Sequence, residues 1–253
     1  MIKNYGVINV EIINHIAIVR MEEKRQNCFT ESFLTGLSSA FEDINTCDEV
    51  RCVVVTGYGN YFSCGGTKEE LISLYESYAG IGSTVIFTDN TVYKIFLKCR
   101  VPVIAAMQGH ALGGGLAMAS FADIMIMARE AMYSANFMNY GFTPGMGATF
   151  IIPYKFGELL SSDMMYTGRA LFGRELEKRG AGAIFVDKKD VMSEAMKIAE
   201  KIVTKPLNTL IVFKKSKQKL VMDKLDVAIQ EELNMHELTF GQSEVLKKIK
   251  EII

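Results

Sequence analysis

The chain has 253 residues, 49% of them hydrophobic, and a formal net charge of −1. This length is enough for one sizeable α/β domain or two small ones. The near-neutral charge gives no support for nucleic acid or an anionic membrane surface as the main partner. No stretch reaches the roughly 18 uncharged apolar residues of a membrane-spanning helix, so no membrane partner is expected.

Cysteine and histidine usage argues against an extracellular or metal-dependent protein. The five cysteines form no CxxC pair and are odd in number, which favours a reduced, cytoplasmic protein. The N-terminal stretch is interrupted by Asn and Glu and does not have the pattern of a secretory signal. The three histidines, His15, His110 and His236, show no HxxxH or HExxH spacing, so no metal site is expected.

The first elements alternate between strands and a helix. Residues 7–21 alternate apolar and polar on both sides of an Asn-His pair, which predicts a β-hairpin with His15 in its turn. Residues 30–44 predict a helix with Thr30 as its N-cap and an apolar face. The β-branched run at 51–57, ended by Gly, is typical of a buried parallel strand.

A mobile segment is expected next, because Gly80 and Gly82 interrupt the partly helical stretch 68–90. The elements that follow are a helix at 91–99, a strand at 101–108, a helix from 113 and a strand at 123–129. This alternation predicts a mostly parallel sheet with crossover helices. The rest of the chain is largely helical, with the best helical patterns at 189–203, after Pro206 and at 224–240.

A run of three glycines, in GHALGGGLA at 109–117, costs chain entropy and needs a reason. A phosphate site at a helix start is one possibility, but the GxGxxG spacing is absent here and in GYGNYF at 57–62. Close packing of a helix on the sheet is a second. The third involves SCGGT at 63–67, because two Gly-rich loops after neighbouring parallel strands can aim two N–H groups at one carbonyl oxygen, forming an oxyanion hole.

Four segments in this order resemble the crotonase (enoyl-CoA hydratase/isomerase) superfamily. They are YFSCGG at 61–66, VPVIAAMQGHALGGG at 101–115, ADIMIMARE at 122–130 and YGFTPGMGATF at 140–150. The resemblance covers nearly the whole chain. It implies an α/β fold with a spiral ββα core over residues 1–200 and a helical trimerisation region over 201–253. It also implies thioesters of CoA or acyl carrier protein as substrates, with oxyanion-hole N–H groups from Gly66 and Gly114.

The two glutamates of the hydratases in this superfamily are missing. One position, three residues after Gly114, holds Ala117, and the other, four residues before Gly141, holds Phe137. Neither side chain can transfer a proton, so hydration by the usual acid–base pair is not expected.

Within the superfamily, AAMQGHALGGG, ANFMNYGFTPGMGATF and MHELTF most resemble the decarboxylating enzyme of polyketide β-branching cassettes. This likeness implies decarboxylation of a 3-methylglutaconyl-type thioester to a 3-methylcrotonyl-type thioester. The substrate would be carried on the phosphopantetheine of an acyl carrier protein, with no resident cofactor or metal. His236 would hold the carboxylate or supply the proton, and the protein would be a homotrimer or a dimer of trimers.

One departure from that subgroup concerns a lysine expected after the first glycine loop. Residues 69–90 contain none, so either Lys68, Tyr75 or Tyr78 holds the carboxylate instead, or the protein relies on His236 alone. A lysine-rich stretch at 213–219 is either a solvated helix face or a docking patch for the acidic carrier protein.

Two alternative functions remain open. An enoyl-CoA isomerase or hydratase could use relocated acid–base groups, although both usual glutamates are absent. A non-catalytic thioester-binding member of a biosynthetic complex is the other alternative, and the missing lysine is its only support.

Overall fold

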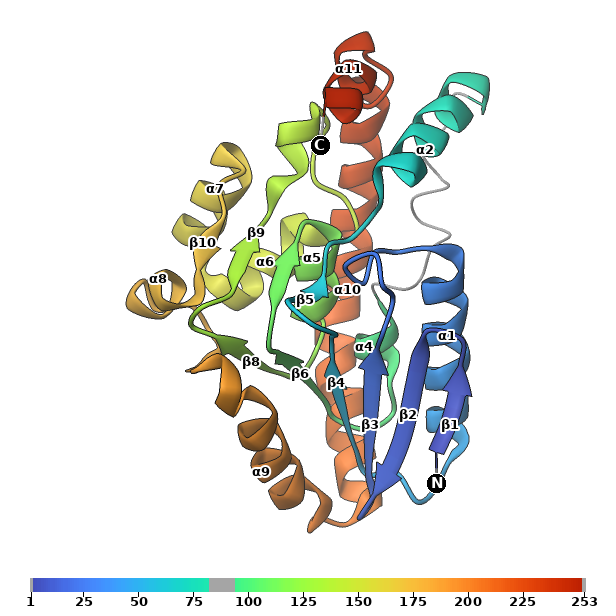
Figure 1. Cartoon of the computed structure of the whole chain (residues 1–253), viewed down its shortest axis with the longest axis vertical. Helices are drawn as coiled ribbons and strands as arrows, with labels where there is room; N and C mark the ends of the chain where they lie inside the picture. Colours follow the sequence, from blue (N-terminus) through green and yellow to red (C-terminus); the bar gives the residue numbers. More distant parts are fainter. Residues whose placement is uncertain (1, 82–93, 252–253) are drawn as a thin grey trace.

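The computed structural model describes residues 2–81 and 94–251, which form two β-sheets with helices around them (Figure 1). In the larger sheet the strand order is β1 (Ile2–Tyr5), β2 (Ile8–Ile13), β3 (Ile16–Met21), β4 (Cys52–Thr56), β6 (Val103–Met107), β8 (Ile124–Ala128) and β11 (Ile184–Val186). The first three strands are antiparallel, and the pairs from β3 to β11 are all parallel. The expected mostly parallel sheet is therefore confirmed.

A second, smaller sheet determines where the site lies. Its order is β10 (Leu171–Phe172), β9 (Met132–Ser134), β7 (His110–Leu112) and β5 (Tyr61–Ser63). Strands β5, β7 and β9 follow β4, β6 and β8 along the chain, and a helix follows each of them, so the chain winds as a spiral of ββα turns. This confirms the architecture implied by the family resemblance. The residue pattern alone missed the second sheet, because two or three residues are too few to show an alternation.

The helices cover the sheets and build the C-terminal region (Figure 1). They are α1 (Glu31–Thr46), α2 (Lys68–Ile81), α4 (Ile95–Lys98), α5 (Gly114–Ser120), α6 (Ala148–Phe156), α7 (Glu158–Thr167), α8 (Gly173–Lys178), α9 (Val191–Val203), α10 (Leu207–Thr239) and α11 (Ser243–Glu251), with 3-10 turns η2 (Asn136–Tyr140) and η3 (Lys188–Asp190). Figure 1 shows α10 running along most of the molecule, and α11 lies against α2. No helix within the two described ranges is both long and apolar enough to cross a membrane.

The two N-terminal predictions are confirmed. Strands β2 and β3 form a hairpin whose turn residues, Asn14 and His15, have φ values of 49° and 68°. This left-handed conformation is typical of two-residue hairpin turns. Helix α1 begins after Thr30, whose side chain accepts a hydrogen bond from the Phe33 N–H. The expected break at Gly80 is wrong, because α2 continues to Ile81. The rest of the expected mobile segment, from Gly82 onward, lies outside the described residues.

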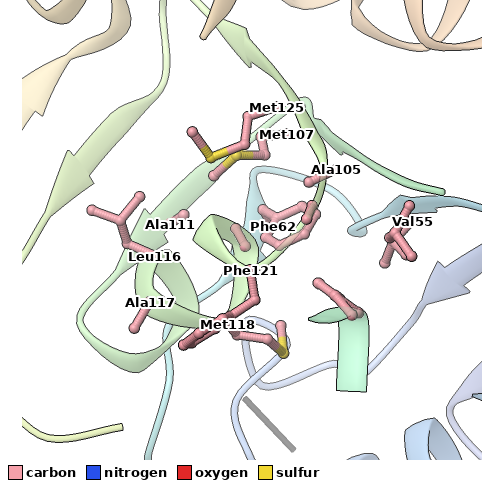
Figure 2. Packing of buried hydrophobic residues seen from close by; sticks show 14 of the residues in the cluster. Val55, Phe62, Ala105, Met107, Ala111, Leu116, Ala117, Met118, Phe121 and Met125 are labelled. Carbon is pink, nitrogen blue, oxygen red and sulfur yellow. The ribbon is translucent and has the colours of Figure 1, made fainter. Parts of the chain in front are cut away.

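Helix α5 is buried on all sides, which explains its run of small and apolar residues. Figure 2 shows Leu116 and Met118 of α5 in one cluster with Phe62 of β5 and Met107 of β6, and all four side chains are fully buried. The helix therefore lies inside the core, between strands from both sheets. This position fixes the glycines at its N-terminal end relative to the small sheet.

The two helical patterns expected after Pro206 form one continuous helix, α10, of 33 residues. The expected boundary between residues 200 and 201 lies in the last turn of α9. The division into a core and a C-terminal helical region remains a prediction.

The lysine-rich stretch 213–219 is not a uniformly solvated surface. Lys214 is only 3% exposed, and its Nζ atom lies 2.5 Å from Asp123 Oδ2 and donates to the Phe96 carbonyl at 3.1 Å. The docking-patch interpretation is therefore wrong for Lys214, which joins α10 to the core. Lys215, Lys217 and Lys219 are exposed.

Candidate active site

A cavity of about 460 Å³ brings together segments that are far apart in the sequence. It is lined by parts of α1 and α2, the loop after β5, the glycines after β7, η2, the loop before α6, and α10. Gly66, Gly114 and His236, the three site residues expected from the sequence, all line it. The structure thus places all three around one space.

The two glycine loops meet because their strands are neighbours in the small sheet. Strands β5 and β7 are parallel, so Cys64–Gly66 and Gly113–Gly115 leave the same edge. The contact is close, since a Cβ atom added at Gly65 would lie 2.9 Å from the Gly114 nitrogen. Among the described residues, the N–H groups of Gly66 and Gly114 have no hydrogen-bond acceptor. Both donors border the cavity and are available to a ligand.

The glycines of the triplet do not all serve the same purpose. A Cβ atom at Gly115 would lie 2.1 Å from the Ser63 carbonyl oxygen, so α5 can pack against β5 only with glycine there. A Cβ atom at Gly114 would meet Met146 Sδ and Phe29 Cε2, both at 2.9 Å. The packing interpretation therefore explains Gly115, whereas Gly114 keeps the cavity wall free of a side chain.

His236 is buried on α10 with 2% of its surface exposed. Its Nε2 atom lies 2.8 Å from the Thr143 carbonyl oxygen. A carbonyl can only accept, so Nε2 carries the proton and donates it, and in the neutral ring Nδ1 is the basic nitrogen. Burial lowers the pKa of His236 below its ordinary value, and the nearby carbonyls of Thr143 and Pro144 oppose this shift. The site therefore holds a histidine that favours the neutral form.

Glu232, one helical turn before His236, was missed from the sequence. Its carboxylate is buried and accepts hydrogen bonds from Gly147 N at 2.7 Å, Thr149 N at 2.8 Å and Thr149 Oγ1 at 2.6 Å. It therefore caps the N-terminal end of α6. Burial raises the pKa of Glu232, and these hydrogen bonds oppose the rise. The four-residue spacing from His236 was the available signal, because it places both side chains on one helix face.

Glu232 and His236 together hold the loop 143–149. Between their two anchor points lies Met146, which has a φ of 63°, a left-handed conformation rarely adopted by residues with long side chains. Gly145 contacts the ring of His236 so closely that a Cβ atom there would lie 2.6 Å from Cε1. The loop thereby places Gly145, Met146 and His236 in the cavity wall.

The positions of the missing glutamates agree with an apolar site. Phe137 of η2 lines the cavity, and Ala117 of α5 is fully buried. Two other carboxylates, Glu31 and Glu70, do line the cavity. Glu70 accepts the Thr67 N–H at 2.9 Å, while Thr67 Oγ1 accepts the Glu70 N–H at 3.1 Å, so this carboxylate caps α2. No motif in the sequence marks either residue as part of a site.

Two of the three candidates for holding the carboxylate, Lys68 and Tyr75, do not line the cavity. Lys68 Nζ donates to the carbonyl of Lys250 at 2.6 Å, and the ring of Tyr75 packs 6.1 Å from that of Phe240. The side chain of Tyr78 lies outside the described part of the structure.

The other two histidines do not line the cavity and have structural roles. His110 accepts the Met132 N–H through Nδ1 at 2.9 Å and packs edge-on against Tyr61, as expected for a packed residue. His15 lies in the hairpin turn. Within the described ranges, no group of three or more His, Cys, Asp or Glu side chains is arranged to hold a metal ion.

Comparison with known proteins shows which family and which relatives the chain resembles. A family model described as enoyl-CoA hydratase/isomerase matches residues 11–251. The chain is 42% identical over 242 residues to the bacillaene synthase decarboxylase PksI of Bacillus subtilis, with 95% of each protein covered.

Two solved structures are similarly close. One belongs to a dehydratase/decarboxylase enzyme couple involved in polyketide β-branching, with a TM-score of 0.93, 39% identity, and 98% and 97% of the two chains covered. The other is the ECH2 decarboxylase domain of CurF from Lyngbya majuscula, with a TM-score of 0.87, 33% identity, and 98% and 99% covered.

Replacing Glu232 by Ala should lower the free energy of unfolding by about 2–4 kcal/mol, because three donors lose a buried acceptor. Urea denaturation measures this change. Glu231→Ala is the matched control, since Glu231 is exposed and its loss should cost no more than about 0.5 kcal/mol. Equal stability of the two variants would show that Glu232 does not hold the loop.

The low pKa of His236 makes stability depend on pH. In the unfolded chain the imidazole of His236 takes up a proton near its ordinary pKa of 6.5, whereas the buried imidazole of the folded protein is protonated only at lower pH. The free energy of unfolding should therefore fall as the pH decreases through about 6.5. His236→Gln retains a donor for Thr143 but does not titrate, so urea denaturation at several pH values should show a smaller decrease than in the wild type. An unchanged pH profile would contradict the assignment.

Proposed function

The chain belongs to the enoyl-CoA hydratase/isomerase family, and we propose that it is a decarboxylase of polyketide β-branching. It removes carbon dioxide from a 3-methylglutaconyl-type thioester on acyl carrier protein and forms a 3-methylcrotonyl-type thioester. The relatives described as decarboxylases support the reaction class. The observation that carries the proposal is the meeting of Gly66, Gly114 and His236 around a cavity whose wall has Phe137 in place of a glutamate.

The proposed oxyanion hole supplies the main stabilisation. The pair of electrons from the broken bond to the carboxylate moves through the conjugated system onto the thioester oxygen, giving a dienolate and neutral carbon dioxide. The Gly66 and Gly114 N–H groups then bind this oxygen as its negative charge grows. One such donor typically contributes about 3 kcal/mol to lowering the barrier. A resident cofactor is not needed, because the conjugated thioester itself accepts the electrons.

His236 supplies the proton that completes the reaction. The dienolate must gain one proton at carbon, so the overall step consumes one proton and releases one carbon dioxide. The neutral imidazole of the free protein first has to be protonated. An anionic substrate beside it favours the imidazolium form and raises its pKa. Binding of the carboxylate thereby loads the ring with the proton that it later delivers.

A hydratase or isomerase with relocated acid–base groups is the second candidate. The presence of Glu31 and Glu70 at the cavity favours it, because carboxylates are the groups such reactions use. The cap formed by Glu70 at Thr67 counts against it, since this carboxylate already has a structural partner.

The product mass separates the two functions. Incubation with 3-methylglutaconyl carrier protein should give a mass loss equal to carbon dioxide, whereas gain of water or an unchanged mass would refute the decarboxylase. His236→Ala should lower kcat by roughly 10²–10⁴-fold if the ring transfers the proton. His15→Ala, in the hairpin turn, is the control and should keep the wild-type rate.

We also propose that the chain acts as a trimer or a dimer of trimers, in the cytoplasm, with acyl carrier protein as its partner. Phe213, Leu220 and Val227 support self-association, because they recur every seven residues on α10 and are each about two-thirds exposed. Such a stripe on one helix face is usually covered by another protein surface. The exposed lysines near Lys217 lie about 28 Å along α10 from His236, so they are remote from the cavity of the same subunit.

Charge introduced into this stripe should disrupt the assembly. Leu220→Glu should shift the mass measured by light scattering from that of an oligomer towards that of one chain. Lys219→Glu, at the exposed neighbouring position, is the control and should leave the mass unchanged. A wild-type protein that is already monomeric would refute this part of the proposal.

A further inference from the structure

Two polar side chains on η2 face the cavity and have no role in the reaction described so far. Asn136 and Tyr140 both line it, and Asn136 Nδ2 donates a hydrogen bond to Tyr140 Oη at 3.2 Å. The ring of Tyr140 stacks on Phe142 with 5.9 Å between centroids, which holds the hydroxyl in place. The pair is thus a fixed polar patch in a largely apolar wall.

The hydrogen bonds of this pair are incomplete. Among the described residues, the Tyr140 O–H has no acceptor, and Asn136 Oδ1 is buried without a partner. If the amide is turned by 180°, Tyr140 donates to Oδ1 and the amide N–H takes the unpartnered place. In the first orientation the Tyr140 O–H and the second amide N–H have no acceptor among the described residues, and in the second orientation both amide N–H groups have none, so the pair keeps donors for a ligand.

The pair lies next to the second glycine loop. Asn136 Oδ1 is so close to Gly113 that a Cβ atom there would lie 2.9 Å away. Burial raises the pKa of Tyr140, and its hydrogen bond with Asn136 opposes this shift. The raised pKa keeps the phenol protonated and able to donate. One ligand can therefore contact this pair with one group and the glycine N–H groups with its thioester oxygen.

We propose that the Asn136–Tyr140 pair donates a hydrogen bond to the carboxylate that the substrate loses, an inference that rests on the proposed function. A carboxylate in an apolar cavity needs donors, and no Lys or Arg from the described ranges lines this one. The two acidic residues there, Glu31 and Glu70, cannot help when ionised. The pair therefore takes the place left open by the missing loop lysine.

A neutral donor suits this position better than a second cation beside the imidazolium of His236. An ammonium group would stabilise the carboxylate strongly in the ground state, and that interaction is lost when neutral carbon dioxide forms, which raises the barrier. The imidazolium differs, because it gives its proton to the dienolate that decarboxylation forms. An amide or phenol stabilises the carboxylate less and still fixes its direction. The phenol keeps its proton throughout, because the electron pair of the broken bond goes to the thioester oxygen.

Two unreactive probes test the assignment without turnover. The 3-methylglutaryl pantetheine thioester carries the carboxylate but lacks the double bond, and the isovaleryl pantetheine thioester has the same skeleton without the carboxylate. Calorimetric titration of the full-length protein should show that Tyr140→Phe weakens binding of the first probe about tenfold. Binding of the second should change less than twofold. Asn136→Ala should show the same selectivity, and the exposed Tyr154→Phe is the control.

Three outcomes would overturn the inference. Equal weakening of both probes would place the donor at the thioester end, and no weakening in either variant would show that the pair binds no carboxylate. A wild-type protein that binds both probes equally would mean that the cavity does not recognise the carboxylate. Because these titrations need no catalysis, their failure is distinct from failure of the decarboxylase, which is decided by the product mass.

Discussion

The cavity depends on one constraint, the attachment of the loop 143–149 to a single face of α10. Glu232 accepts the Gly147 and Thr149 N–H groups, and His236, one turn later, donates to the Thr143 carbonyl. Both ends of the loop are therefore fixed by side chains of the same helix. The energy of these buried hydrogen bonds offsets the cost of the left-handed conformation of Met146. Without α10, the wall opposite the glycine loops would lose both its histidine and its shape.

The facing wall is determined by the small sheet in a different way. Parallel pairing of β5 with β7 brings two glycine loops to one edge, and the buried helix α5 leaves no room for a side chain at Gly115. Among the described residues, the N–H groups of Gly66 and Gly114 remain without acceptors, because the backbone turns away from regular pairing at that edge. Packing and chemistry are linked here: Gly115 allows α5 to enter the core, and the adjacent Gly114 presents one of the donors proposed to bind the thioester oxygen.

The sequence predicted those features that long or strongly patterned segments encode. The hairpin, the cap at Thr30, the buried strand at 51–57 and the C-terminal helices were all predictable from periodicity and capping. The small sheet was not visible in the pattern, because its strands are too short, and only the family resemblance implied the spiral. The burial of Lys214 and its ion pair with Asp123 were also missed, since a lysine in a charged run gives no local sign that it packs inward. Similarly, the cavity position of Asn136 and Tyr140 depends on which loops η2 meets, which is a property of the tertiary structure.

The composition of the cavity explains why decarboxylation is favoured over hydration. Hydration requires a carboxylate to activate water, and at one of the two positions where the hydratases carry it the cavity has the apolar ring of Phe137. The same apolar wall lowers the barrier to decarboxylation. A carboxylate concentrates its charge on two oxygens and loses much solvation on entering, whereas the dienolate spreads its charge and carbon dioxide carries none. Removing water therefore raises the energy of the starting state more than that of the product-like state. With the proposed N–H donors for the thioester oxygen in place, a fold that stabilises enolates becomes a decarboxylase when apolar side chains replace its acid–base groups.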